Sequence, residues 1–256
     1  MLTATAVAQG NVVTEGLNVW FDFGNTECFN PTLFTGSITA GTLFNNLAPG
    51  FSAVSGTING AVNWSTAFGG CMNTTNANTS TLQYTGGLSA SFTIQTIVTP
   101  GTDANPDLNW VSDKGGWPTA RFANGLIWAQ ANGGVQSGNY LVPVLYAGAS
   151  AATINALIQP ISGNDIYTRF PSVYTISTNG SNQHITYTNN IFKATDTTTR
   201  TRGNSSIGTI SLNFDNAVGD RHGIGRLCAY LQYNRQLSDA EVYQNVQYYL
   251  NRFGTR

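Results

Sequence analysis

The segment most informative about the fold runs from Gly225 to Phe253 and reads GRLCAYLQYNRQLSDAEVYQNVQYYLNRF. Its first nine residues are largely apolar and aromatic, which is typical of a core strand. Ser238 and Glu241 then form a capping box, in which each side chain can bond the backbone N–H of the other residue. Apolar residues recur at helical spacing after it, so we predict a strand followed by a helix at about 238–252; the apolar residues are Val242, Val246, Tyr249, Leu250 and Phe253.

Upstream of this segment, short candidate strands alternate with turn residues. Gly, Asn, Thr and Ser interrupt the chain nearly every ten residues, which is typical of a β-sandwich or barrel. A single all-β domain can reach about 200–250 residues, so we predict one domain over residues 15–254, preceded by an N-terminal arm, residues 1–14. Strands are expected at 17–23, 81–84, 91–99, 121–130, 140–146, 165–170, 173–178, 184–188 and 207–214.

Charged residues are scarce and unevenly distributed. The 256 residues include 11 Lys and Arg and 12 Asp and Glu, which gives 9% charged residues and a net charge of −1. None lies between Glu27 and Asp103 or between Arg121 and Asp165. This composition argues against nucleic-acid binding, because that affinity comes mainly from Lys and Arg at phosphates. It also favours a surface that packs against other proteins through neutral hydrogen-bonding groups.

The C-terminal third resembles the closing segment of laminin-G-like, concanavalin A-like lectin and glucanase domains. The matching pattern is YNRxLSxxE, present here from Tyr233 to Glu241, followed by Gln244-Asn245 and Arg252-Phe253-Gly254. The opening strand 16–25, the segment Leu43–Leu47 and the strand at 91–94 are similar to further parts of the family pattern. The resemblance implies an all-β, two-sheet jelly-roll sandwich with one short C-terminal helix.

Enzymes of this family carry paired carboxylates on one strand, in an ExDxE pattern that aims them into one cleft. Only three glutamates exist here, Glu15, Glu27 and Glu241, and none has an aspartate two residues after it. The two histidines, His184 and His222, belong to no recognisable catalytic motif, and a surface or edge-strand position is expected for them. We therefore expect a protein that is not an enzyme.

Two candidate sites fall in the segment between residues 103 and 128. Asp103, Asn105 and Asp107 alternate oxygen side chains, and laminin-G-like sandwiches often hold calcium at the loop rim, so they are candidate calcium ligands. An Asx-rich turn is the alternative interpretation. Trp110, Trp117 and Trp128 flank a loop with Asp113, and these four are candidate glycan-binding residues. Trp20 and Trp64 are expected in the core, and no cofactor is expected beyond the structural calcium.

The three cysteines, Cys28, Cys71 and Cys228, are an odd number at irregular spacing. This spacing excludes a zinc ribbon and a dense disulfide framework. Buried free thiols are expected, because an unpaired cysteine packs as a small apolar residue; a Cys28–Cys71 bridge is the alternative. The sequence shows neither a secretory signal nor a run of apolar residues that could span a membrane.

Two functional hypotheses follow. This version of the motif is similar to those of structural proteins of tailed bacteriophages, which implies a virion location and a capsid decoration protein bound to the major capsid protein. Such a protein would form homo-oligomers through its neutral surface, and residues 1–13 would order on a neighbour. The alternative is a carbohydrate-binding adhesin of a tail or fibre that recognises glycans on the host surface.

Overall fold

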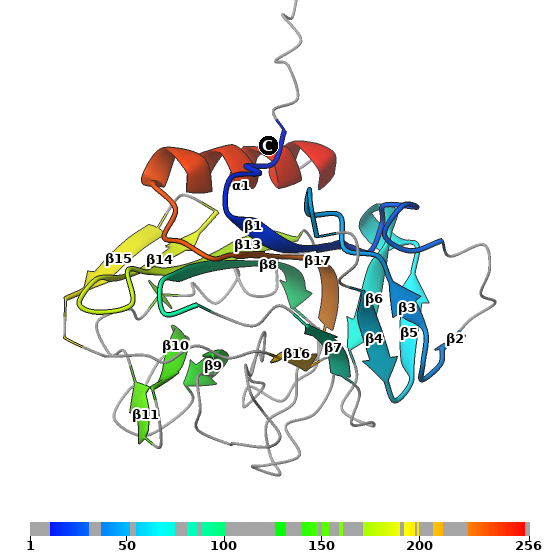
Figure 1. Cartoon of the computed structure of the whole chain (residues 1–256), viewed down its shortest axis with the longest axis horizontal. Coiled ribbons are helices and arrows are strands. Elements are labelled where there is room, and N and C mark those ends of the chain that lie inside the picture. Colours follow the sequence, from blue (N-terminus) through cyan, green and yellow to red (C-terminus); the bar gives the residue numbers. More distant parts are fainter. Residues whose placement is uncertain are drawn as a thin grey trace, which may run out of the picture.

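A computed structural model describes the chain over residues 11–30, 37–51, 55–74, 81–85, 89–100, 126–131, 140–147, 150–153, 159–160, 171–189, 192–197, 199, 207–211 and 225–253. The described part is an antiparallel β-structure with one helix at its C-terminal end (Figure 1). This arrangement confirms the predicted all-β fold class. Its strands are β1 (Leu17–Asp22), β2 (Ser37–Ile38), β3 (Leu43–Phe44), β4 (Gly56–Asn59), β5 (Val62–Ser65), β6 (Cys71–Thr74), β7 (Thr81–Thr85), β8 (Phe92–Pro100), β9 (Leu126–Ala131), β10 (Tyr140–Ala147), β11 (Ser150–Thr153), β12 (Gln159–Pro160), β13 (Ser172–Thr178), β14 (His184–Thr188), β15 (Phe192–Asp196), β16 (Ile207–Ser211) and β17 (Gly225–Tyr233).

The largest sheet has nine strands and is organised around β17. Its order is β15-β14-β13-β8-β17-β6-β5-β2, and β1 also pairs with β17. One edge of β17 pairs with β8 along its length. Its other edge is shared, because β6 pairs with residues 225–227 and β1 pairs with residues 229–233. The strand predicted at 225–233 is therefore the one that joins the first strand to the rest of the sheet.

Two smaller sheets complete the β-structure. One has the order β16-β7-β4-β3, and the other has the order β11-β10-β12 with β9 paired to β10. The first packs on the nine-stranded sheet through a core of aromatic and aliphatic side chains. Phe21 and Tyr84 meet edge to face there, with ring centroids 5.7 Å apart. Burial of such side chains is the main stabilising contribution to a sandwich.

The helix α1 (Asp239–Phe253) lies across the opposite face of the nine-stranded sheet (Figure 1). Its apolar face is buried against a second cluster that includes Leu231 and Tyr233 of β17. The predicted capping box is present, since the Ser238 N–H donates to Glu241 Oε2 at 2.8 Å and the Glu241 N–H donates to Ser238 Oγ at 3.4 Å. The structure thus confirms the predicted helix within one residue at each end.

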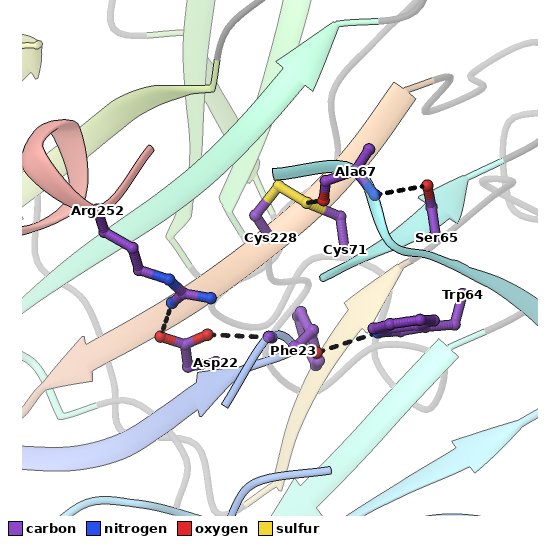
Figure 2. Close-up of a disulfide and its surroundings, with 9 residues drawn as sticks. Asp22, Phe23, Trp64, Ser65, Ala67, Cys71, Cys228 and Arg252 are labelled. Carbon is purple, nitrogen blue, oxygen red and sulfur yellow. Dashed lines mark hydrogen bonds and ion pairs between the residues drawn. A yellow bond between two sulfur atoms is a disulfide. The ribbon is translucent and has the colours of Figure 1, made fainter. Parts of the chain in front are cut away.

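The cysteines differ from the expectation. Cys71 and Cys228 form a disulfide across the β6–β17 pair (Figure 2). Cys28 is the buried free thiol among the described residues. The expected free thiols at 71 and 228 and the alternative Cys28–Cys71 bridge were both wrong. The physical reason is the register, because Met72 opposes Leu227 and so places Cys71 next to Cys228.

Two further expectations are corrected. His184 is 1% exposed rather than on the surface, and its Nδ1 lies 2.8 Å from Thr178 Oγ1 in the neighbouring strand. Among the described residues of the predicted arm, Val12 and Val13 are buried against this same chain. The Val13 N–H donates to Asn245 Oδ1 of α1 at 2.8 Å, so these residues cover the helix-side cluster. His222 and residues 165–170 lie outside the described residues.

Candidate functional site: a pocket after the first strand

A pocket of about 410 Å³ lies between the turn that follows β1 and the loop that follows β3. Its volume falls within the range of small-molecule sites, which is roughly 300–1,000 Å³. The described lining combines one tryptophan with amide, carboxylate and small apolar residues. It consists of Trp20, Asn25, Glu27, Asn45, Asn46, Leu47, Ala48, Pro49 and Gly50. We call it the Trp20 pocket.

The first wall is an Asx turn. The side chain of Asn25 accepts a hydrogen bond from the Glu27 N–H at 2.8 Å, and the Asn25 carbonyl accepts from Cys28 and Phe29 at 3.0 Å. Asn commonly closes such a turn through its own side chain. The turn leaves Glu27 exposed at the rim, whereas Cys28 and Phe29 enter the core.

The second wall depends on Asn46, which is 3% exposed. Its Oδ1 accepts from the Trp20 N–H at 2.8 Å and from the Ala48 N–H at 3.0 Å. Its Nδ2 donates to the carbonyl oxygens of Asn18 at 2.8 Å and of Phe51 at 3.3 Å. The Asn46 side chain thereby joins the loop to β1 and also fixes the conformation of the loop. A buried amide needs such hydrogen bonds to offset the cost of its desolvation.

Direct bonds join the two walls. Asn45 Nδ2 donates to the carbonyl oxygen of Glu27 at 2.9 Å, and the Asn45 N–H donates to the Cys28 carbonyl at 2.9 Å. The Leu47 N–H donates to the Trp20 carbonyl at 2.9 Å. The pocket is therefore held in shape by the protein itself before any ligand binds, which lowers the entropic cost of binding.

Trp20 is anchored from the helix. Its indole Nε1 donates to the hydroxyl of Tyr249 at 2.9 Å, and Tyr249 is fully buried in α1. Burial raises the pKa of Tyr249 well above its ordinary value, so this hydroxyl stays protonated at neutral pH. Trp20 itself is half-buried, with part of the side chain packed on the helix-side cluster.

A buried ion pair joins the end of β1 to the last turn of α1. Arg252, in the last turn of α1, pairs with Asp22, which is 1% exposed (Figure 2). The other carboxylate oxygen of Asp22 accepts from the Gly24 N–H at 3.1 Å. A Cβ at Gly24 would lie 2.5 Å from the Gly69 carbonyl oxygen, so only glycine fits where the end of β1 passes the segment before β6.

The residues predicted as sites from the sequence are mostly outside the described part. This holds for the calcium candidates Asp103, Asn105 and Asp107. It also holds for the glycan candidates Trp110, Asp113 and Trp117. Trp128 lies in β9, where it is opposite Pro143 of β10. Within the described ranges, no group of three His, Cys, Asp or Glu residues is placed to hold a metal.

The sequence did not identify the Trp20 pocket. Trp20 was expected in the core, and the structure instead places it half-buried at the pocket. A signal was present at Asn45-Asn46, because two amides follow a short apolar pair where the chain must turn. That pattern indicates a loop, but it does not show that the loop meets the turn after the first strand.

Within the residues described, no helix is long and apolar enough to cross a membrane.

No protein-family model and no curated protein matches the chain. Solved structures do match its fold. Domain 4 of AbnA, a GH43 extracellular arabinanase from Geobacillus stearothermophilus, was solved in complex with arabinotriose. It has a TM-score of 0.57 and 12% identity, and the match covers 91% of this chain and all of that domain.

Two toxin structures are also similar. Botulinum neurotoxin type C, whose way into cells depends on interaction with two ganglioside molecules, has a TM-score of 0.57 at 11% identity over 84% of this chain. The binding domain of Paraclostridial Mosquitocidal Protein 1 has a TM-score of 0.59 at 14% identity over 85% of this chain. The chain spans about half the length of these two chains, 51% and 52%. These similarities show the fold, a β-sandwich with the layout of these binding domains.

Proposed function

We propose that the protein is a non-enzymatic carbohydrate-binding domain and that the Trp20 pocket is its binding site. The observation that carries the proposal is the combination in one preformed pocket of a tryptophan, three asparagines and a carboxylate. Sugar rings present apolar C–H faces and many hydroxyl groups, so an aromatic side chain with nearby amide and carboxylate oxygens is the chemistry that binds them.

Two of the similar structures support the proposal. The arabinanase domain binds arabinotriose, and the binding domain of botulinum neurotoxin DC was solved in complex with SialylT, with a TM-score of 0.54 and 10% identity to this chain. Proteins that contain a similar sandwich were thus solved in complex with sugars, and this chain matches 52% of the neurotoxin domain. A shared fold alone does not establish a function, so the proposal depends on the pocket.

A binding role without catalysis fits the charges of the pocket. Glycoside hydrolysis uses two carboxylates roughly 5–10 Å apart, and Glu27 is the single carboxylate among the described residues that line the pocket. The nearby Asp22 is buried and paired with Arg252. Of the two sequence hypotheses, the pocket therefore favours the carbohydrate-binding alternative, and its location on a tail or fibre stays a prediction. The capsid decoration role, the virion location and the homo-oligomer depend on the sequence resemblance and the neutral surface, and they stay predictions.

A glycan array tests the proposal. Wild-type protein should bind at least one class of oligosaccharide, and Trp20→Ala and Asn45→Ala should each weaken that binding by about tenfold or more, since an aromatic contact or hydrogen bond contributes roughly 1–3 kcal/mol. Tyr243→Ala is the control, because Tyr243 is an exposed aromatic residue on α1 that does not line the pocket.

Trp117→Ala distinguishes the two candidate sites. If Trp117→Ala abolishes binding and Trp20→Ala does not, the rim predicted from the sequence is the site and the Trp20 pocket is not. Each variant is first compared with the wild type in thermal unfolding, because Trp20 also contacts Tyr249 and its loss lowers stability.

A further inference from the structure

The Trp20 pocket carries a negative charge that no described cation balances. Glu27 is exposed at its rim, and no lysine or arginine is among the described residues that line it. Arg252 does not line the pocket and forms its ion pair with Asp22. Glu27 is therefore the one charged side chain among the described residues that line the pocket.

Several hydrogen-bond donors around the pocket are already engaged with the protein, whereas the Asn25 side-chain N–H groups and the second N–H of Asn45 Nδ2 donate to no described residue. The indole N–H of Trp20 is bound to Tyr249, and both amide bonds of Asn46 go to backbone carbonyls. Asn45 Nδ2 donates to the Glu27 carbonyl. In contrast, the Glu27 carboxylate and Asn45 Oδ1 accept no hydrogen bond from any described residue. The acceptors that the pocket offers to the hydroxyl groups of a ligand therefore include a charged one, the Glu27 carboxylate.

From these two observations, and on the basis of the proposed function, we infer that the pocket selects neutral, hydroxyl-rich glycans over acidic ones. A hydroxyl group of the ligand donates a charge-assisted hydrogen bond to the Glu27 carboxylate or a neutral hydrogen bond to Asn45 Oδ1. A uronate or sialate carboxylate has no proton to donate at neutral pH, and Glu27 repels it. Specificity thus comes from repulsion of the wrong ligand as well as attraction of the right one.

The size of the effect follows from Coulomb's law. We take a separation of about 6 Å between the two like charges and an effective dielectric constant of about 40. Their repulsion then lowers the binding constant of the acidic sugar roughly tenfold relative to that of the neutral sugar. The exposed position of Glu27 makes this repulsion sensitive to salt, because the screening length is about 10 Å at 0.1 M ionic strength and about 3 Å at 1 M.

Titration with matched oligosaccharides tests the inference. The probes are neutral galactose and glucose oligosaccharides and their counterparts in which a hydroxymethyl group is replaced by a carboxylate, galacturonate and glucuronate. Wild-type protein should bind the neutral member of the preferred pair about tenfold more tightly in dilute buffer, and less than threefold more tightly at 1 M salt.

Variants at Glu27 identify the cause. Glu27→Gln keeps an acceptor but removes the charge, so the preference should fall below threefold, mainly through tighter binding of the acidic sugar. Glu27→Asp keeps the charge and should keep most of the preference. Glu15→Gln is the matched control, because Glu15 is also exposed but does not line the pocket, and it should change neither affinity.

The outcomes separate this inference from the proposed function. Equal binding of neutral and acidic sugars by the wild type, or a preference that Glu27→Gln leaves unchanged, overturns the inference and leaves carbohydrate binding intact. Binding of no sugar in either set or on the glycan array overturns the proposed function, and the inference with it.

Discussion

At the scale of single residues, Asn245 fixes the helix to the sheet. It is fully buried in α1, and its Nδ2 donates to Gln95 Oε1 at 2.6 Å and to the Tyr233 hydroxyl at 2.8 Å. Its Oδ1 accepts from Val13, whose carbonyl in turn accepts from the Tyr233 hydroxyl at 3.0 Å. This network joins the N-terminal segment, two strands of the sheet and the helix. Each of its hydrogen bonds replaces one that the same group forms to water in the unfolded chain.

Replacement of Asn245 by alanine should be strongly destabilising. The variant leaves Gln95 Oε1 and the Val13 N–H buried without their partner, and each such group costs about 1–3 kcal/mol. We expect Asn245→Ala to lower the free energy of unfolding by about 2–4 kcal/mol in urea titrations. Asn251→Ala, at an exposed position of the same helix, should change it by less than about 0.5 kcal/mol. Equal small effects of both variants would show that the network is not formed.

Prediction from sequence was weakest at this scale. The apolar face of the helix could be predicted from its spacing, but Asn245 lies on that face as a polar exception, and only its contacts explain it. Trp20 was expected in the core because it lies in a strand of apolar residues. Whether such a residue faces a core or a pocket depends on which loops cover it, and local sequence carries no information on that.

At the scale of secondary structure, β17 and α1 were predicted with accurate bounds because both carry strong local patterns. The short strands β2 to β6 were not predicted. They contain two to four residues each, too few to show an alternation, and β4 and β5 mix Gly, Asn and Ser with their apolar residues. These strands exist because longer neighbours pair with them, so their position is set by the tertiary structure.

The Cys71–Cys228 bridge is a further consequence of tertiary structure, since 157 residues separate its two cysteines. Unfolded but unreduced protein should show one reactive thiol in an assay with a thiol reagent, from Cys28, and three after reduction. Reduction should also lower the stability by about 2–5 kcal/mol, because closure of a long loop restricts the unfolded chain. Three reactive thiols before reduction would contradict the bridge.

The start of α1 should make stability depend on pH. The Arg235 side chain donates to Glu241 at 3.0 and 2.5 Å, and these bonds lower the pKa of Glu241 from 4.5 to about 2. A carboxyl group whose pKa is lower in the folded state stabilises the protein above its unfolded pKa, and this contribution is lost as the pH falls from about 5 to 2.

We expect Glu241→Gln to lose part of this pH dependence. Between pH 7 and pH 3, the wild type should lose about 1 kcal/mol more stability than the variant, a value that allows for the partial exposure of the pair. Urea titrations at both pH values measure the difference. The same loss in both proteins would mean that the Arg235–Glu241 pair contributes nothing to stability.

At the scale of the whole molecule, the two faces of the nine-stranded sheet have different roles. One face packs on the small sheet and forms the sandwich core, and the other is covered by α1 (Figure 1). The Trp20 pocket forms beside the helix-covered face, where α1 supplies Tyr249 to Trp20 and Arg252 to Asp22. The helix predicted from the sequence thus also supports the candidate site.

The resemblance seen in the sequence predicted the sandwich, because its pattern lies in β1, β8, β17 and α1, which form the centre of the large sheet and its cover. It did not predict the site. The pocket combines a turn after β1 with a loop after β3, and those two segments meet only in the folded chain.

Sugar binding in the Trp20 pocket would be visible in a crystal structure of the protein with the oligosaccharide that binds most tightly on the array. We expect electron density for a sugar ring in contact with Trp20, with hydroxyl groups within about 3 Å of Glu27 and Asn45. Density for the sugar elsewhere on the molecule, with the pocket holding only water at a saturating ligand concentration, would contradict it.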